Sequence, residues 1–227
     1  KKFLTKIINE AQRQSAYEFI VKELQAGHQA FVICPLIDES DKLGIKSVKS
    51  EYVKLSTGVF KDFKIGLLHG RLKSAEREKV LMAMAENKIN ILVATSIIEI
   101  GIDMPEATVI MIEEADRFGL AQLHQYRGRV GRRSDQGFCF LMTSDSADNI
   151  NHRLDAMTKF DDGFTLAQAD LKFRGPGEVY GLAQKGFPEL KMANFYDTVL
   201  IKQSREAALE LLKEDETLNK FISLKIK

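Results

Sequence analysis

The sequence lacks several features that would place it at once in a functional class. Its 227 residues carry a formal net charge of only +1, so no overall field draws the protein to nucleic acid or to an anionic membrane. No apolar run approaches the length of a membrane span, and no signal peptide opens the chain. The four histidines are scattered, which argues against a zinc site; they stand at 28, 69, 124 and 152. Any binding of a polyanion must therefore come from local patches.

Cysteine is scarce, and both cysteines lie within apolar runs. We expect Cys34 and Cys139 to be buried, reduced thiols of a cytosolic protein, with a single disulfide as the alternative. Hydrophobic residues make up 44% of the chain and charged residues 29%, which supports a real core under a solvated surface. Because no methionine opens the sequence, we expect the chain to be a fragment of a longer protein.

A phosphate-binding loop of the form GxxxxGK[ST] is also missing. The segment GIKS at 44–47 lacks the first glycine and separates glycine from lysine. Acidic residues do occur together in IEEAD at 112–116, and we interpret them as acids at the end of a strand, with Arg117 or Arg127 as candidate partners. The chain alone is therefore not expected to hold the phosphates of a nucleotide tightly.

Short apolar runs alternate with helical patterns over the first 145 residues. Strands are predicted at 30–37, 64–70, 90–95, 108–115 and 137–143, and helices at 9–26, 48–57 and 74–86, with a further helix over QYRGRVGRR. Gly27 suits a helix end, and Ser74 suits a helix start. The opening residues before the first helix are interpreted as its approach. This alternation is typical of an α/β fold, a parallel sheet with helices on both faces.

The pattern changes after about residue 145. Two helices, 146–160 and 165–173, are joined by DDG, and a glycine- and proline-rich stretch follows. A last amphipathic helix is predicted at 194–214. We therefore divide the chain into domains 1–145 and 146–227, the second holding a helical hairpin, an extended loop and a terminal helix.

One stretch concentrates positive charge on a loosened backbone: QYRGRVGRR, residues 125–133, here called the arginine stretch. On a helix, Arg129, Arg132 and Arg133 would share a face, and these like charges with two interior glycines would cost roughly 2–3 kcal/mol of helix stability. A bound polyanion would compensate, because guanidinium groups grip phosphate oxygens with forked hydrogen bonds. The alternative is a solvated basic helix end.

A second stretch, ATSIIEIGIDMPEATVIMI at 94–112, places polar residues in a loop between two strands. Asp103 lies in a mostly apolar loop at the mouth of the sheet, where it can accept hydrogen bonds from sugar hydroxyls. Thr95 can donate to a phosphate. The alternative for Asp103 is a turn residue that bonds its own backbone.

Taken together, these segments resemble the second RecA-like domain of superfamily-two helicases. FVICPLI is similar to motif IV, LLHGRLKSAEREKVL to the segment that follows it, ATSIIEIGIDMP to motif V and QYRGRVGR to motif VI. The resemblance covers about residues 15–145, in the order that the family has, and implies a RecA-like parallel sheet.

The resemblance also implies roles for single residues. Arg129 and Arg132 would reach the phosphates of ATP held by a neighbouring domain, and such arginines are worth about 10³–10⁵ in rate in related phosphoryl transferases. The nucleotide side would include Gly101, Asp103 and Gln125, and the nucleic-acid side Thr95, His69 and Gly70.

The tail narrows the resemblance. Residues 161–194 are similar to the translocation (TRG) motif of the RecG family of branched-DNA translocases, which makes Arg174 and Gln184 candidates to relay motor movement. The transcription-repair coupling factor has a related tail, but RGPGE and QKGFPE fit RecG better. Without the resemblance, an ordinary helical hairpin packed on the sheet would be the preferred interpretation.

The expected function is the C-terminal motor half of an ATP-dependent DNA helicase that remodels stalled forks and Holliday junctions in the bacterial cytoplasm. ATP and Mg²⁺ would be bound mainly by an N-terminal RecA-like domain of the same parent chain. The parent chain would also contain a wedge domain. The fragment alone is expected to be inactive. Two alternatives stay open: a coupling-factor translocase, or a non-catalytic module that binds nucleic acid or protein through its basic helix.

Overall fold

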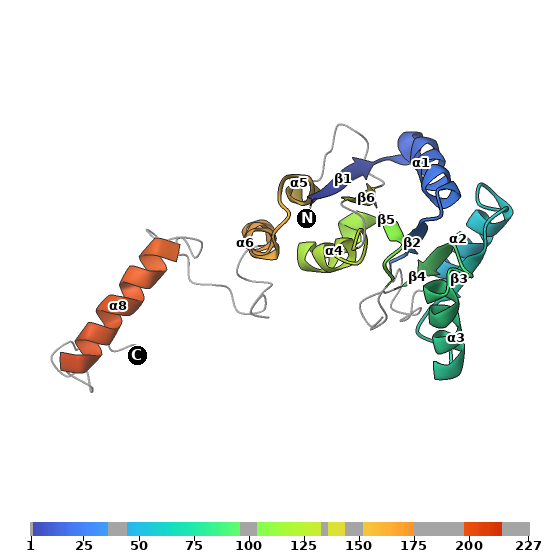
Figure 1. The fold of residues 1–227 in the computed structure, drawn as a ribbon. Helices are drawn as coiled ribbons and strands as arrows, with labels where there is room; N and C mark the ends of the chain where they lie inside the picture. The colour runs from blue at the N-terminus through green and yellow to red at the C-terminus, as the bar shows by residue number, and fades with distance from the viewer. Residues whose placement is uncertain are drawn as a thin grey trace. The chain divides into compact units, whose positions relative to one another are not determined.

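The computed structural model describes residues 2–35, 45–95, 104–132, 136–143, 152–174 and 198–214. Their strands form one sheet of six, in the order β1-β6-β5-β2-β4-β3, and every neighbouring pair is parallel (Figure 1). The strands are β1 (Lys2–Ile8), β2 (Gln29–Ile33), β3 (Ile65–Leu68), β4 (Ile91–Ala94), β5 (Ala107–Ile112) and β6 (Gln136–Met142). The predicted parallel α/β sheet is confirmed.

Helices connect these strands. The first part of the chain carries η1 (Glu10–Gln12), α1 (Arg13–Gln25), α2 (Ile45–Thr57), α3 (Ser74–Ala85), η2 (Ala115–Arg117) and α4 (Leu120–Arg127). After β6 come α5 (His152–Lys159), α6 (Gly163–Arg174) and α8 (Thr198–Glu214). The two predicted helices joined by DDG and the terminal helix are thus confirmed.

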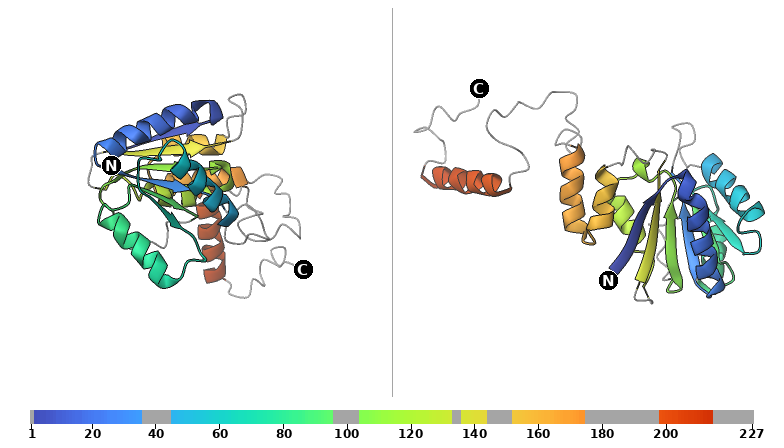
Figure 2. Two further views of the ribbon diagram at one scale, coloured as in Figure 1. Left: turned by 90° about the vertical axis from the view of Figure 1, so that its right-hand side faces the viewer. Right: turned by 90° about the horizontal axis from the view of Figure 1, so that it is seen from above.

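The central strands are buried on both faces, and their alternate side chains divide the core in two. Phe31 and Ile33 of β2 pack in one cluster with α3, α4 and α5, whereas Ala30 and Val32 pack in the other with α1 and α2. Figure 2 shows the same arrangement, with α1 and α2 on one side of the sheet and α4 and α5 on the other. All residues of β2, β4 and β5 are buried, which explains their nearly continuous apolar sequences.

Local signals at helix ends were right at one place and wrong at another. Gly27 has a φ of +91°, which suits glycine and ends α1. Ser74, predicted to cap α3, is instead its first residue. The carboxylate of Glu76 accepts a hydrogen bond from the Lys73 backbone N–H at 3.0 Å, so the acid of the first turn stabilises the helix start.

The edge strand β1 was not predicted. It pairs in parallel with β6 along its whole length, from Lys2 opposite Gln136 to Ile8 opposite Met142. Thr5 and Lys6 interrupt its apolar residues, because an edge strand exposes part of its surface. Its sequence therefore has no long apolar run. The interpretation of these residues as the approach to a helix was therefore wrong.

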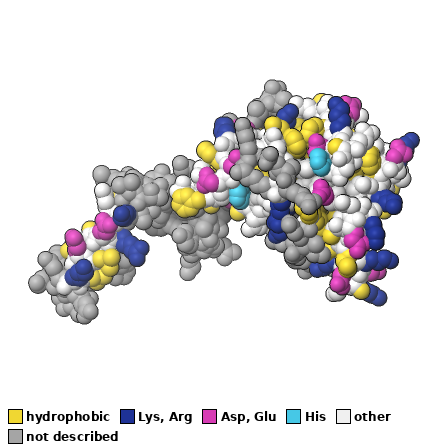
Figure 3. Space-filling model, viewed as in Figure 1, with side chains coloured by type: hydrophobic (Ala, Val, Ile, Leu, Met, Phe, Trp, Pro, Cys, Tyr) yellow, Lys and Arg dark blue, Asp and Glu magenta, His cyan; other side chains and the backbone are white. Residues whose placement is uncertain are grey.

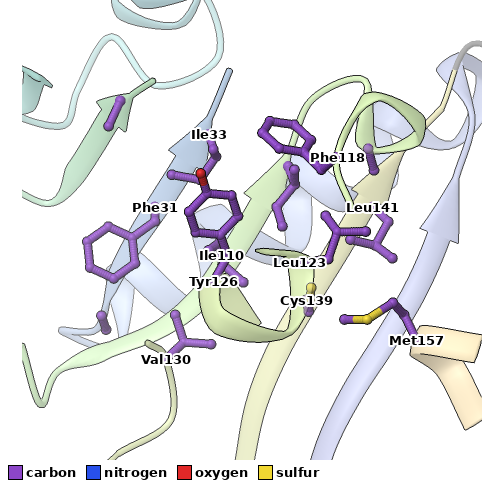
Figure 4. Close-up of a cluster of buried hydrophobic side chains, with 14 of the residues drawn as sticks. Phe31, Ile33, Ile110, Phe118, Leu123, Tyr126, Val130, Cys139, Leu141 and Met157 are labelled. Atoms are coloured by element: carbon purple, nitrogen blue, oxygen red, sulfur yellow. The ribbon is translucent and has the colours of Figure 1, made fainter. Parts of the chain in front are cut away.

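The two cysteines are free and buried, as expected. Burial raises the pKa of the Cys139 thiol to about 12 and raises that of Cys34 as well. Cys139 lies in the cluster under α4, beside Tyr126, Leu123 and Met157 (Figure 4). This cluster joins α4 to the sheet and to α5.

The chain falls into two compact units, residues 1–170 and 171–227. Leu154 and Met157 of α5 and Leu166 of α6 are buried in the core cluster that contains α4, so they belong to the first unit. In the second unit, α8 has exposed Leu209 and Leu212 on its apolar side. The division of the chain at residue 145 stays a prediction, and the extended loop expected after α6 lies outside the described residues.

Candidate functional site

The carboxyl edge of the sheet gathers polar residues that directly follow strands. His69 follows β3, Thr95 follows β4 and Glu113 follows β5. The backbone N–H of Thr95 donates to the carbonyl of Leu68 at 3.3 Å, so the ends of β3 and β4 are held together. Because β3 and β4 are paired, these two predicted nucleic-acid residues lie at neighbouring strand ends. His69 is buried and Thr95 is half-buried.

The surroundings of His69 favour an anion. Burial lowers the pKa of its imidazole, and the positive charges of Lys49 and Arg71 lower it further. Its Nδ1 atom is buried and has no hydrogen-bond partner within the described part of the chain. Exposed Gly70 is the next residue. A neutral imidazole in the positive field of Lys49 and Arg71, beside a residue without a side chain, suits the approach of a phosphate.

Glu113, at the same edge, is held by a different arginine from the ones predicted. Its carboxylate accepts two hydrogen bonds from the Arg13 guanidinium, at 2.7 and 2.9 Å, and Arg13 also donates to the hydroxyl of Tyr17 at 2.9 Å. Burial raises the pKa of Tyr17 to about 12. Glu114 does pair with Arg117, as expected. The Glu113 pair therefore fastens α1 to the end of β5.

The arginine stretch is not one helix. Helix α4 ends at Arg127, and Gly128 follows as its cap with a φ of −66°. Arg129 is half-buried and Arg132 is exposed, outside regular structure, while Gln125 is exposed on the helix. The prediction that Arg129 and Arg132 share a helix face is therefore wrong. A backbone turn, rather than helical spacing, sets their positions.

The reason for the turn is Gly131. Its φ is +63°, and its N–H donates to the carbonyl of Ala107, the first residue of β5, at 2.8 Å. A Cβ at this position would lie 2.7 Å from the Cα and N of Gly137, near the start of β6. Because Gly131 has no side chain, the backbone of the sheet can approach it this closely.

The two groups of candidate residues lie at opposite ends of the parallel strands, one at their carboxyl ends and one at their amino ends. His69 and Thr95 follow the last residues of their strands, whereas Gly131 is bonded to the first residue of β5. Helix α4 begins after β5, at the carboxyl edge, and runs back to the amino edge, where Arg129 and Arg132 are carried. The two groups of predicted site residues are therefore separated by the length of the strands.

Arg127 is a residue whose position the sequence did not reveal. It was a candidate partner of the acids at 113–116, but its guanidinium is fully buried and points elsewhere. It donates to the carbonyls of Met157 and Phe160 at 2.6 and 2.9 Å. That pairing prediction was wrong, because only tertiary structure brings the end of α5 against α4.

Several predicted residues lie where the structure gives no description. Gly101, Asp103 and Gln184 fall outside the described residues, as does Arg133 of the arginine stretch. Arg174 is the last residue of α6, and its side chain is likewise outside the description. Their roles stay predictions.

The described residues support three further findings. Within it, no three His, Cys, Asp or Glu side chains come together as a metal site requires. None of its helices is both long and apolar enough to span a membrane. Lysines and arginines are interspersed with acids on the face shown in Figure 3, in keeping with the net charge of +1.

Comparison with known proteins identifies both parts of the chain. The model of the helicase conserved C-terminal domain matches residues 12–134, and that of the ATP-dependent DNA helicase RecG, domain 3, C-terminal, matches residues 160–223. The ATP-dependent DNA helicase RecG of Synechocystis sp. is 46% identical over 98% of this chain, and that of Thermotoga maritima 44% over 99%. The chain spans only 27% and 29% of these two relatives.

Solved structures agree. A RecG bound to a three-way DNA junction is 40% identical, with a TM-score of 0.68, over 92% of this chain and 26% of that one. The DUF1998 helicase MrfA bound to DNA shares the fold alone, at 16% identity and a TM-score of 0.51, over 74% of this chain and 24% of that one. The chain therefore belongs to the helicase conserved C-terminal domain family and, by its second match and its relatives, to the RecG branch of that family.

Proposed function

We propose that this chain is the C-terminal motor half of an ATP-dependent DNA helicase or translocase that remodels branched DNA, such as stalled forks and Holliday junctions. The names of its relatives, and the three-way junction bound by one of them, support DNA as the substrate. The observation that carries the proposal is the anchoring of the arginine stretch through Gly131 to the sheet. A rigid support suits side chains that must meet a second domain in one geometry.

In this proposal Arg129 and Arg132 complete an ATP pocket whose other wall lies elsewhere in the parent protein. Guanidinium groups fit the donor set that phosphate oxygens require, and they stabilise negative charge as the terminal phosphoryl group is transferred. Asp103 and Gly101 would line the nucleotide side, and Gln125 would link the nucleotide and nucleic-acid sites. The arginines would thereby make hydrolysis depend on the approach of the two domains.

Mg²⁺ would be held by the other domain with the ATP phosphates. The described residues of this chain offer no cluster of acids for it, and the sequence has no phosphate loop. The chain spans about a quarter of the length of its relatives. A phosphate loop and the acidic ligands of Mg²⁺ would therefore lie in another part of a parent protein of that length. The isolated chain should therefore hydrolyse ATP negligibly. An N-terminal RecA-like domain and a wedge domain are its proposed partners.

At the carboxyl edge, DNA phosphates would lie against His69, Gly70 and Thr95. Lys49 and Arg71 supply positive charge beside them. Such contacts read the backbone and not the bases, which suits an enzyme that moves along DNA of any sequence. The helical hairpin and the residues after it would be the TRG part, with Arg174 and Gln184 relaying movement. Repeated domain closure would then shift the duplex.

The test compares three arginines in the full-length protein. Arg129→Ala and Arg132→Ala should each lower the kcat of DNA-stimulated ATP hydrolysis by about 10³-fold or more, with ATP binding largely kept. Arg117→Ala is the matched control, since Arg117 is exposed and pairs with its neighbour Glu114. It should leave kcat unchanged. Unchanged turnover in both Arg129→Ala and Arg132→Ala would reject the proposed role and favour a non-catalytic binding module.

A further inference from the structure

One of the largest fully buried side chains in the described core is a charged one. Arg127 is the last residue of α4 and has 0% relative exposure, in a group otherwise made of aromatic and aliphatic residues. Burial lowers the pKa of its guanidinium, and Asp161 opposes that effect. Arginine keeps its charge under such conditions. A buried cation of this kind is retained only where its surroundings supply several acceptors.

Those acceptors come from the end of a different helix. Nη1 of Arg127 donates to the carbonyl of Met157 at 2.6 Å, and Nη2 donates to the carbonyl of Phe160 at 2.9 Å. Asp161 lies 3.5 Å away. The last carbonyls of a helix have no partners within it and carry partial negative charge. Arg127 therefore caps the carboxyl end of α5 from α4.

Two further elements meet the same guanidinium. Its Nη1 donates to Oγ1 of Thr5 in β1 at 3.3 Å, and its centre lies 5.2 Å from the ring of Phe3. Its Nη2 also lies 3.3 Å from Nδ1 of His124. The His124 ring packs against Gly163, the first residue of α6, where an added Cβ would lie 3.1 Å from the ring. The end of α4, the edge strand and the α5–α6 hairpin are thus joined at one side chain.

Packing alone would not require an arginine there. Its Nε atom is buried without a hydrogen-bond partner in the part of the chain that the structure describes. An unsatisfied buried donor is costly, and well-packed apolar residues commonly replace buried ions without loss of stability. What an apolar side chain cannot do is hold the hairpin in one register through directed hydrogen bonds.

Arg127 also lies directly before the turn that carries Arg129 and Arg132. Arg127 precedes Arg129 by two residues, and its own carbonyl accepts a hydrogen bond from Val130 N–H at 3.4 Å. The turn that carries Arg129 and Arg132 therefore starts from the residue that grips α5. We infer that Arg127 is a positioning residue that makes the α5–α6 hairpin move as one body with the arginine stretch.

This inference rests on the proposed function, because the coupled events are ATP hydrolysis and DNA movement. The side chain of Arg127 touches neither ATP nor DNA in it. Loss of the tie should leave the ATP pocket able to turn over, while the hairpin no longer follows it. The signature is a fall in the number of forks unwound for each ATP hydrolysed, rather than a fall in hydrolysis.

The experiment measures both rates in the full-length protein on a forked duplex. For Arg127→Met we expect kcat and KM for ATP within about threefold of wild type and at least a tenfold fall in forks unwound per ATP. Arg127→Lys, which keeps the charge but loses the fork of donors, should fall in between. Arg117→Ala should match wild type. An unchanged ratio in Arg127→Met, or an equal fall of both rates, overturns the inference.

Milder variants decide the matter if Arg127→Met does not fold. Thr5→Val and Asp161→Asn each remove one partner and keep the arginine, so each should lower the ratio two- to fivefold without changing hydrolysis. No change in either would reject the role of Arg127. A wild-type protein without DNA-stimulated hydrolysis would instead refute the proposed function, and the inference with it. A hydrolysing wild type with an unchanged variant ratio removes only the inference.

Discussion

The two glycines of the arginine stretch should respond in opposite ways to the same substitution. Gly131 has a φ of +63°, and a Cβ there would lie 2.7 Å from backbone atoms of Gly137 and 3.0 Å from the carbonyl carbon of Gln136. These atoms belong to the beginning of β6 and cannot move without distorting the sheet. Gly128 has a φ of −66°, and a Cβ there would meet only carbonyl oxygens at 3.5 Å, an ordinary contact.

The size of the effect follows from these distances. For Gly131→Ala, the left-handed backbone costs about 1–2 kcal/mol for a residue with a side chain. Forcing a methyl group into a filled space costs about 1–3 kcal/mol more. The sum, about 2–5 kcal/mol, is a large part of the roughly 5–15 kcal/mol that stabilises a domain. Gly128→Ala should instead be neutral or stabilising by about 0.4–1 kcal/mol, because alanine restricts the unfolded chain.

Urea denaturation measures the difference. The chain has no tryptophan, so far-UV circular dichroism is the suitable probe, with thermal unfolding as a second measure. Gly131→Ala should lower the midpoint temperature by roughly 4–20 °C, at about 2–4 °C per kcal/mol for a chain of this size. Gly128→Ala should lower neither midpoint. If Gly131→Ala is as stable as Gly128→Ala within about 1 kcal/mol, the sheet does not anchor the arginine stretch as described.

Two further predictions concern the carboxyl edge. Burial, with the charge of Glu113, raises the pKa of Glu51 above its ordinary value of 4.5, so the folded state holds this proton more tightly and loses stability as pH rises past 4.5. Glu51→Gln should therefore match wild type in urea denaturation at pH 4 and exceed it at pH 7; a variant less stable at both would contradict this. In the full-length protein, Lys49→Ala and Arg71→Ala should each weaken duplex binding and reduce the slope of log affinity against log salt by about 0.9, measured by fluorescence anisotropy. An unchanged slope would remove these residues from the DNA path.

Local sequence patterns predicted most of the sheet and its helices. Strands such as 107–112 are apolar throughout because both faces are covered, and that pattern is visible without neighbours. Tyr17, Ile20 and Leu24 repeat at helical spacing and are buried together under the sheet. Gly27 ends its helix as its residue type suggests. The family of the chain was equally readable, since it rests on short segments in a fixed order, and the comparisons confirm it.

The edge strand and the ends of the arginine stretch were beyond such patterns. Strand β1 has mixed polarity and exists because β6, more than 130 residues away, supplies its hydrogen bonds. Helix α4 ends before Arg129 because Gly131 must bond to Ala107 and fit against Gly137. Both contacts are made with the sheet and not within a helix, so helical spacing was a misleading guide to where these arginines lie.

The sequence by itself determined the fold class, the faces of the helices, the thiol state of Cys34 and Cys139, and the family, because each depends on periodicity, residue type or a short motif. Tertiary structure alone decided that Arg127 is buried against α5, and that the candidate phosphate-binding residues lie at opposite edges of one sheet. Both outcomes depend on which distant backbone supplies an acceptor. The residue type of a side chain limits which groups it can bind, and the tertiary structure determines which of those groups lie close to it.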